Sequence, residues 1–193
     1  RTGHLFACDE DGVAPDIMTV AKGLGAGYQA IGAMLVGKRI FEAIAAGTGS
    51  FQHGHTYMGH PVACAAGLAV QTAIREENLL ENVRTRGAEL MTALQERFGN
   101  HAHVGDIRGR GLFVGLEFVA DRASKEPFEP GRALNTRIKA EAMERGVMIY
   151  PMGGTIDGRR GDHLLVAPPF IVESEHIEHI VSVLGDAVDA ALA

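Results

Sequence analysis

The sequence predicts an α/β protein in which short strands are followed by longer helices. Short apolar runs bounded by glycine or proline, such as residues 17–21 and 31–36, are typical of strands in a sheet. Longer stretches carry apolar residues at helical spacing, as in residues 78–98. With 193 residues, of which 46% are hydrophobic and 22% charged, the chain is long enough to bury a core. We therefore expect a globular chain with one large or two small domains.

The first part of the chain predicts two strands of a buried sheet and then two helices. In order, these elements are expected at residues 17–21, 31–36, 39–46 and 61–75. The glycine-rich segment 47–50 separates the two helices. Pro61 is compatible with the first turn of the second helix, where no N–H is needed. Lys22 is then expected where the first strand ends.

From about residue 76 onward, the pattern predicts a small α+β domain. A helix at residues 78–98 carries an apolar stripe that includes Leu90 and Leu94, and Gly99 and Asn100 end it. The later strands are expected at residues 104–108, 112–119, 147–150 and 164–166, and the later helices at residues 132–145 and from residue 173 onward. We therefore divide the chain into residues 1–75 and 76–193.

The charge and the cysteines argue against several classes of protein. Because the net charge is −6 and acidic and basic residues are interspersed, neither nucleic acid nor an anionic membrane is an expected partner. No apolar run approaches the roughly 18 residues of a membrane span, and the first residues lack a signal-peptide pattern. Cys8 and Cys64 do not form a CxxC pair, so we expect reduced thiols in a cytoplasmic protein.

Lys22 is the first catalytic candidate. It is a single cation between an apolar run and the glycine-studded turn Gly23-Leu24-Gly25-Ala26-Gly27-Tyr28. A lysine in such a place can be a partly desolvated amine that attacks a carbonyl group. The alternative is a surface lysine beside a turn. A dinucleotide-binding turn is disfavoured, because the position five after Gly23 is Tyr28 and the GxGxxG pattern is not satisfied.

Three histidines, His53, His55 and His60, lie close together in the sequence. Histidine is a common ligand of zinc and other transition metals, so a metal-dependent hydrolase is an alternative function. Neither a carboxylate nor a cysteine lies between Gly47 and Ala63, and glycines separate the histidines. We therefore expect no metal site in this segment.

Six motifs follow one another along the first part of the chain. They are RTGHLFA (residues 1–7), GVAPDI (12–17), AKGLGAGY (21–28), IGA (31–33), HGHTYMGHP (53–61) and ACAA (63–66). In this order the motifs closely resemble class III aminotransferases, specifically the ω-transaminase-like enzymes of subgroup II. Those enzymes use pyridoxal 5'-phosphate (PLP) and have the PLP-dependent transferase fold type I.

The resemblance implies roles for two residues. Lys22 matches the family's catalytic lysine, which binds PLP covalently. Thr56 matches a threonine that reaches the PLP phosphate of the neighbouring subunit, and a hydroxyl beside backbone N–H groups suits a phosphate dianion. The resemblance therefore implies a homodimer with the active site shared across its interface. It also implies that residues 1–75 are the C-terminal part of the large PLP-binding domain with an interdomain helix, followed by the small C-terminal domain.

The resemblance covers only about the C-terminal half of a full enzyme. The family's aspartate that pairs with the pyridine nitrogen of PLP would lie before Arg1, as would the aromatic residue that stacks on the ring. We therefore expect this chain to be incomplete as an enzyme. A truncated, non-catalytic subunit of the same fold is one alternative that this leaves open.

Substrate recognition is expected to involve Arg159 and Arg160. Many relatives carry a carboxylate-binding arginine two residues before an Ala-Pro-Pro step, and the corresponding residue here is Leu165. Arg159 and Arg160 lie in a glycine-flanked loop, as does the mobile arginine of ω-transaminases similar to the β-alanine:pyruvate type. The alternative is that both are solvated loop charges.

The resemblance as a whole implies transfer of an amino group from an amine or ω-amino acid to a keto acid such as pyruvate. Within the family, a glutamate-1-semialdehyde aminomutase or a decarboxylating relative would use the same lysine and remains an alternative.

Overall fold

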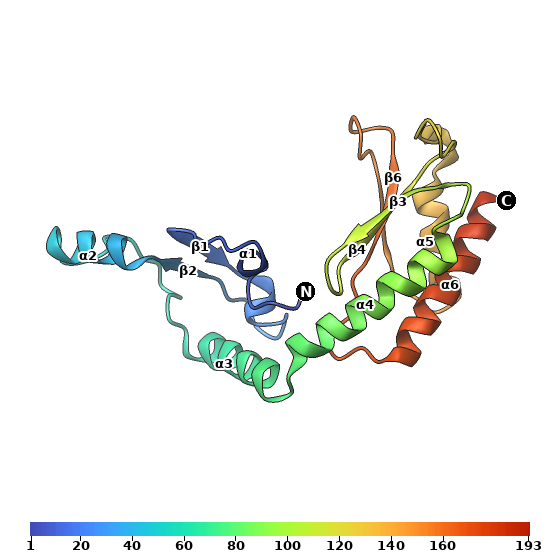
Figure 1. Ribbon diagram of the computed structural model, residues 1–193. Helices are drawn as coiled ribbons and strands as arrows, with labels where there is room; N and C mark the ends of the chain where they lie inside the picture. The colour runs from blue at the N-terminus through green and yellow to red at the C-terminus, as the bar shows by residue number, and fades with distance from the viewer. The chain divides into compact units, whose positions relative to one another are not determined.

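The computed structural model describes residues 1–193, which form two compact units (Figure 1). One unit, here called the lysine unit, consists of Cys8–Leu79. The other, here called the sheet unit, consists of Leu80–Ala193 together with Arg1–Ala7. The chain therefore passes from one unit to the other twice, after Ala7 and after Leu79. No helix of this chain combines the length and the hydropathy that crossing a bilayer requires.

The lysine unit is built on one antiparallel strand pair followed by helices. Its elements are α1 (Ala7–Glu10), β1 (Ile17–Val20), the 3-10 turn η1 (Lys22–Leu24), β2 (Ala33–Val36), α2 (Lys38–Ala46) and α3 (Pro61–Glu76). Ile17 lies opposite Val36 and Val20 lies opposite Ala33. The connection between the strands is therefore residues 21–32, and it contains the glycine turn that follows Lys22.

The prediction that these two strands lie in a buried sheet is wrong for this chain. Side chains on β1 and β2 are mostly exposed, with Ile17 at 52% and Val36 at 37%. Within residues 8–79 only Gly25, Ala63 and Gly67 are buried. The physical reason is that β1 and β2 pair only with each other, and the unit supplies too few side chains to cover both of their faces.

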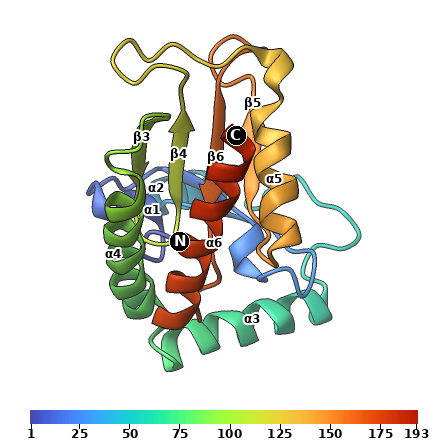
Figure 2. The ribbon, with the colours of Figure 1, turned by 90° about the vertical axis from the view of Figure 1, so that its right-hand side faces the viewer.

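The sheet unit is a four-stranded antiparallel sheet with three helices on one face (Figure 2). Its elements are α4 (Leu79–Phe98), β3 (Val104–Gly109), β4 (Val114–Phe118), the 3-10 turn η2 (Pro130–Arg132), α5 (Leu134–Glu144), β5 (Tyr150–Gly153), β6 (Asp162–Val166) and α6 (Ser174–Leu192). The strand order is β3-β4-β6-β5. The mixture of helices and strands agrees with the predicted α/β class.

The core of the sheet unit lies between the sheet and its helices. Along β4, Val114, Leu116 and Phe118 are buried, whereas Gly115 and Glu117 on the other face are half-buried. This alternation is the pattern expected for a strand with one face in the core. The three helices contribute their buried stripes to the same cluster, including Leu90 and Leu94 of α4. None of these three helices covers the opposite face of the sheet (Figure 2).

One predicted strand begins in the wrong place. Residues 147–150 were expected to form a strand, but β5 starts at Tyr150, which lies opposite Leu165. Val147 and Ile149 are buried, so the apolar pattern reports burial and not strand pairing. The partner strand β6 ends at Val166 because the next residues include Pro168, which has no N–H to donate to a ladder.

Candidate active site

Lys22 lies directly after β1, at the start of the η1 turn, where the sequence predicted it. Its φ angle is 45°, a left-handed conformation that is uncommon for a residue with a side chain. The side chain is exposed, and its amine has no hydrogen-bond or ion-pair partner within the chain. The expected partial desolvation is therefore not seen in this chain. What the local fold provides is an unpaired primary amine on a turn of fixed backbone.

The turn that carries Lys22 is anchored on α3. Nε2 of Gln71 donates hydrogen bonds to the carbonyl oxygens of Leu24 at 3.2 Å and Gly23 at 3.4 Å. Gly67 is buried, and a Cβ there would come within 3.3 Å of Cδ1 of Ile31. Two points on one helix therefore hold the turn and its return segment.

The glycines of the turn serve two different purposes. Gly25 is buried, and a Cβ there would lie 2.7 Å from Cγ2 of Ile31, so close packing requires glycine. At Gly23 and Gly27, in contrast, a Cβ would meet no heavy atom within 4 Å. A side chain at either of these two positions would therefore point into open space.

Thr56 lies in the segment that leads into α3. It is exposed, and its hydroxyl has no hydrogen-bond partner within the chain. Backbone bonds from Met58 N–H to the His55 carbonyl and from His60 N–H to the Tyr57 carbonyl fold the residues around it into turns. Thr56 and Lys22 belong to the same unit, but no hydrogen bond joins their side chains.

The histidines of this segment do not converge as metal ligands. The rings of His53 and His60 contact Phe51 and Tyr57, with centroids 5.9 and 5.7 Å apart, respectively. The side chains whose potential ligand atoms do converge are Glu173, Glu175 and His176, all exposed at the start of α6. Glu173 and His176 form the capping box of that helix, which accounts for their proximity.

The predicted substrate residues, Arg159 and Arg160, lie in the sheet unit on the loop between β5 and β6. Oδ1 of Asp157 accepts hydrogen bonds from the backbone N–H groups of Arg159 at 2.9 Å and Arg160 at 2.7 Å. Its Oδ2 accepts a third bond from Nε of Arg160 at 3.0 Å. The bonds from Arg160, followed by that from Arg159, lower the pKa of Asp157 to about 2. The same carboxylate raises the pKa of Arg160.

The two arginines therefore differ in their freedom. Arg160 is bonded to Asp157, and its Nη1 also lies 3.8 Å from Oε1 of Glu126. The exposed guanidinium of Arg159 has no partner within the chain. At the base of the loop, Oγ1 of Thr155 lies 2.6 Å from Nδ1 of His163, so the loop backbone is fixed at both ends. Apart from the flanking glycines, no sequence pattern indicates the roles of Asp157 and Thr155.

The face of the sheet opposite the helices carries a hollow of about 690 Å³ near this loop. Its apolar lining includes Phe113, Gly115 and Leu165, and its polar lining includes Glu117 and His163. The strand register places these side chains in rows, with Glu117 opposite His163 and Gly115 opposite Leu165. The leucine that replaces the expected arginine therefore contributes an apolar wall to this hollow.

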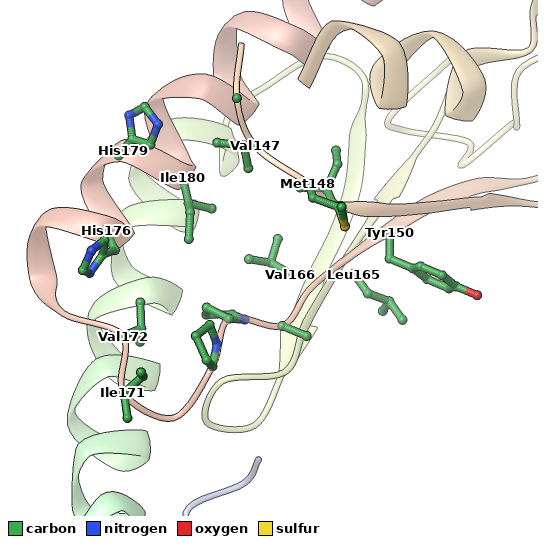
Figure 3. A pocket seen from close by; sticks show the side chains of 15 residues that line it. Val147, Met148, Tyr150, Leu165, Val166, Ile171, Val172, His176, His179 and Ile180 are labelled. Carbon is green, nitrogen blue, oxygen red and sulfur yellow. The ribbon is translucent and has the colours of Figure 1, made fainter. Parts of the chain in front are cut away.

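A second cavity, of about 600 Å³, lies between the start of α6 and the segment before β5 (Figure 3). Its walls are mostly aliphatic side chains, with His176 and His179 of α6 on one side and Tyr150 on the other (Figure 3). It contains no lysine, arginine or carboxylate among its lining residues. We therefore regard it as an apolar groove and not as a catalytic centre.

Comparisons with known proteins match nearly the whole chain. The sequence model of the family described as Aminotransferase class-III matches residues 1–188. An aminotransferase of Gibberella zeae is 46% identical over 193 residues, which make up 100% of this chain and 38% of that protein.

Two solved structures are similar over nearly the whole chain. A thermostable (S)-enantioselective omega-transaminase from Thermomicrobium roseum has a TM-score of 0.89 at 36% identity, covering 100% of this chain and 41% of that one. An amine transaminase from an uncultivated Pseudomonas species, in its PLP-bound (internal aldimine) form, has a TM-score of 0.88 at 36% identity, covering 99% and 42%. The chain thus spans about two fifths of the length of the relatives it matches.

Proposed function

Because the chain belongs to the class-III aminotransferases, we propose that it contributes the lysine-bearing part of a PLP-dependent aminotransferase. The reaction would move an amino group from an amine or ω-amino acid to a keto acid such as pyruvate. The observation that carries the proposal is the unpaired amine of Lys22, held on a turn that Gln71 and Gly67 anchor to α3.

The residues around Lys22 fit PLP. A primary amine without a competing partner is the group that a cofactor aldehyde requires, and the chain is open at Gly23 and Gly27. Lys22 would hold the cofactor covalently, and the unpaired hydroxyl of Thr56 would bind the phosphate of the cofactor that the neighbouring subunit holds. PLP, when bound, supplies an electron sink next to the reacting carbon. Nζ of Lys22 would accept a proton from that carbon and pass it on to the position that is protonated next.

We infer that Arg159 recognises the substrate carboxylate and that Arg160 shapes the loop. The support is that Arg159 has an unpaired guanidinium, whereas Arg160 is bonded to Asp157. A planar guanidinium suits a carboxylate, because it offers two parallel N–H donors. Because the position of the relatives' carboxylate-binding arginine is Leu165 here, β6 offers no arginine to an α-carboxylate. This favours an amine donor without an α-carboxylate.

The proposal extends to assembly and location. Thr56 has no partner within its own chain, and the exposed strands of the lysine unit offer apolar surface, both of which support a homodimer with a shared active site. Cys8 and Cys64 are both free, which supports a reducing compartment such as the cytoplasm.

The test is borohydride reduction of the complete gene product after addition of PLP, followed by peptide mapping. We expect one modified lysine, Lys22, and no modification in Lys22→Ala. Lys38→Ala is the matched control, because Lys38 is an exposed lysine of the same unit, 3.5 Å from Glu42. Labelling that survives in Lys22→Ala would refute the role of Lys22.

The absence of any adduct in a folded, dimeric protein would favour the non-catalytic alternative. If Lys22 is labelled, product analysis with pyruvate and an amine separates a transaminase from an aminomutase or a decarboxylating relative. Only a simple transaminase converts pyruvate to alanine and forms a carbonyl product from the amine without releasing carbon dioxide.

A further inference from the structure

Arg1 joins the start of the chain to the segment that follows β6. Its Nη1 donates hydrogen bonds to the carbonyl oxygens of Ala167 at 2.9 Å and Pro168 at 2.6 Å. The guanidinium also lies over the ring of Phe170, 5.8 Å from its centroid. The backbone carbonyl of Arg1 accepts a bond from the N–H of Leu112 at 2.9 Å. One residue therefore ties together the β3–β4 connection and the end of β6.

The bonded segment has few other means of support. Pro168 and Pro169 have no N–H group, so neither can donate a backbone bond that would hold the segment in place. Pro168 is buried, and a buried carbonyl without a donor destabilises the fold. Partial burial lowers the pKa of the Arg1 guanidinium, but arginine remains protonated at neutral pH. Its two charge-assisted bonds therefore persist under ordinary conditions.

Close packing fixes Arg1 in place. Gly111 has a φ of +55°, and a Cβ there would lie 2.4 Å from the carbonyl oxygen of Arg1. On its other side Gly111 contacts Gly87 of α4. A Cβ at Gly87 would lie 2.5 Å from Cα of Gly111. Nη1 of Arg84 donates to the carbonyl of Gly3 two residues along. The backbone at Arg1 is thus seated against α4 and cannot shift easily.

The other half of the segment is held from α4. Nδ2 of Asn82 donates to the carbonyls of Phe170 at 2.6 Å and Val172 at 3.0 Å. The whole connection from β6 to α6, which also forms one wall of the apolar groove (Figure 3), is therefore bonded at two points. Of these two, Arg1 is the one next to β6. The β6 strand in turn begins immediately after the loop of Arg159 and contains Leu165.

We propose that Arg1 is a positioning residue that fixes β6, and with it the loop of Arg159, by bonding the carbonyls of Ala167 and Pro168. The link to substrate rests on the function proposed above. Arg1 also belongs to the short segment Arg1–Ala7 that packs in the sheet unit and continues directly into the lysine unit at Cys8. The bonds of Arg1 therefore lie within the sheet unit, seven residues before one of the two points where the chain passes between the units.

The experiment compares Arg1→Met and Arg1→Lys in the complete gene product. Arg132→Met is the matched control, because Arg132 also bonds a backbone carbonyl, that of Leu192, and lies over a ring, that of Phe128. In Arg1→Met we expect faster amide hydrogen exchange in residues 159–172 than in the control. Arg1→Lys, which keeps a cation and N–H donors, should restore much of the protection.

Kinetics test the link to substrate. Loss of bonds worth about 1 kcal/mol in positioning corresponds to about a fivefold rise in KM. We expect this rise for pyruvate in Arg1→Met, with kcat and the KM for an amine lacking a carboxylate unchanged. A purely structural residue would lower the melting temperature and change both KM values together.

The two readouts separate the possible failures. Unchanged exchange in residues 159–172 would overturn the positioning role, whether or not the protein is an aminotransferase. Faster exchange with equal changes in both KM values would overturn the link to the carboxylate. Failure of the wild-type protein to convert pyruvate would refute the proposed function, while the exchange comparison would still decide the role of Arg1.

Discussion

Arg160 donates both its backbone N–H and its Nε–H to the carboxylate of Asp157, at 2.7 and 3.0 Å. The neighbouring Arg159 gives only its backbone N–H to the same carboxylate, so its side chain stays free. Asp157 therefore binds the side chain of one arginine and leaves the side chain of the adjacent arginine unbonded. The difference cannot be read from the dipeptide, because it depends on which side chain faces Asp157.

We expect Arg159→Ala and Arg160→Ala to have different kinetic effects. A charge-assisted bond to a carboxylate contributes about 1.5–3 kcal/mol, so Arg159→Ala should raise the KM for pyruvate by about 10- to 100-fold. The KM for an amine without a carboxylate should not change. Arg160→Ala should change the KM for pyruvate by less, because it affects substrate only through the loop. An unchanged KM for pyruvate in both variants would rule out a role for this loop in carboxylate binding.

Asp157 gives the loop a dependence on pH. Its pKa in the folded chain is about 2, below the value of about 3.9 in an unfolded chain, so it stabilises the fold when ionised. This contribution is complete above about pH 4 and is lost as the pH falls towards 2. Asp157→Asn removes the titration, so the difference in melting temperature between wild type and variant should narrow between pH 5 and pH 3. A difference that stays constant over this range would contradict the assignment.

Much of the fold could be predicted because local signals and tertiary packing agree. The helix α3 begins at Pro61 as expected, and α4 ends at Phe98 before Gly99. Lys22 also follows β1 as its neighbours indicated. In these cases proline, glycine and the apolar spacing act within a few residues of the feature that they determine.

The features that the sequence did not predict depend on contacts between residues far apart in the chain. The strand β5 starts at Tyr150, opposite Leu165 of β6, and no pattern within residues 147–150 reveals this pairing. The bonds of Arg1 to Ala167 and Pro168 link positions more than 160 residues apart. Whether β1 and β2 are covered is likewise a matter of the other chain segments around them, and their apolar sequences alone suggested burial.

Gly87 of α4 tests the close packing behind Arg1. A Cβ at this position would lie 2.5 Å from both Cα and the carbonyl carbon of Gly111, and backbone atoms cannot move aside as a flexible side chain can. We expect Gly87→Ala to destabilise the fold by about 1–3 kcal/mol, although alanine favours helices. Gly131→Ala is the control, since a Cβ there meets nothing within 4 Å. Chemical denaturation measures both, and a stabilised Gly87→Ala would show that the packing is looser than described.

Asp162 caps a helix that lies elsewhere in the sequence. The residue before α5, Ala133, provides no side-chain cap, and Oδ1 of Asp162 on β6 instead accepts the N–H of Asn135 at 3.2 Å. Asp162→Ala should therefore cost about 1 kcal/mol of stability. Asp162→Asn keeps an acceptor oxygen and should preserve the cap.

The stability contributed by Asp162 also depends on pH, with a sign opposite to that for Asp157. Partial burial raises the pKa of Asp162, and the bond from Asn135 offsets this only in part. A carboxyl group whose folded pKa is raised loses stability as the pH rises from its unfolded value through its folded value. Asp162→Asn should therefore gain stability relative to wild type as the pH rises above about 4. Urea denaturation at pH 4 and pH 7 measures the free energies of unfolding of wild type and Asp162→Asn. An equal difference between the two proteins at both pH values would argue against burial of the charge.

Gln71 should affect cofactor binding more than stability. Its bond to the Leu24 carbonyl holds the turn that presents Lys22, and a single such bond contributes about 0.5–1.5 kcal/mol. In Gln71→Ala we expect the melting temperature to change little, because the lysine unit buries few side chains around this bond. The apparent affinity for PLP should fall by about two- to tenfold, since the amine is no longer held in one place. Gln95→Ala removes an exposed glutamine from α4 and should leave PLP affinity unchanged. Titration of the complete gene product with PLP, followed by absorbance, measures both variants, and equal affinities would mean that α3 does not position Lys22 through Gln71.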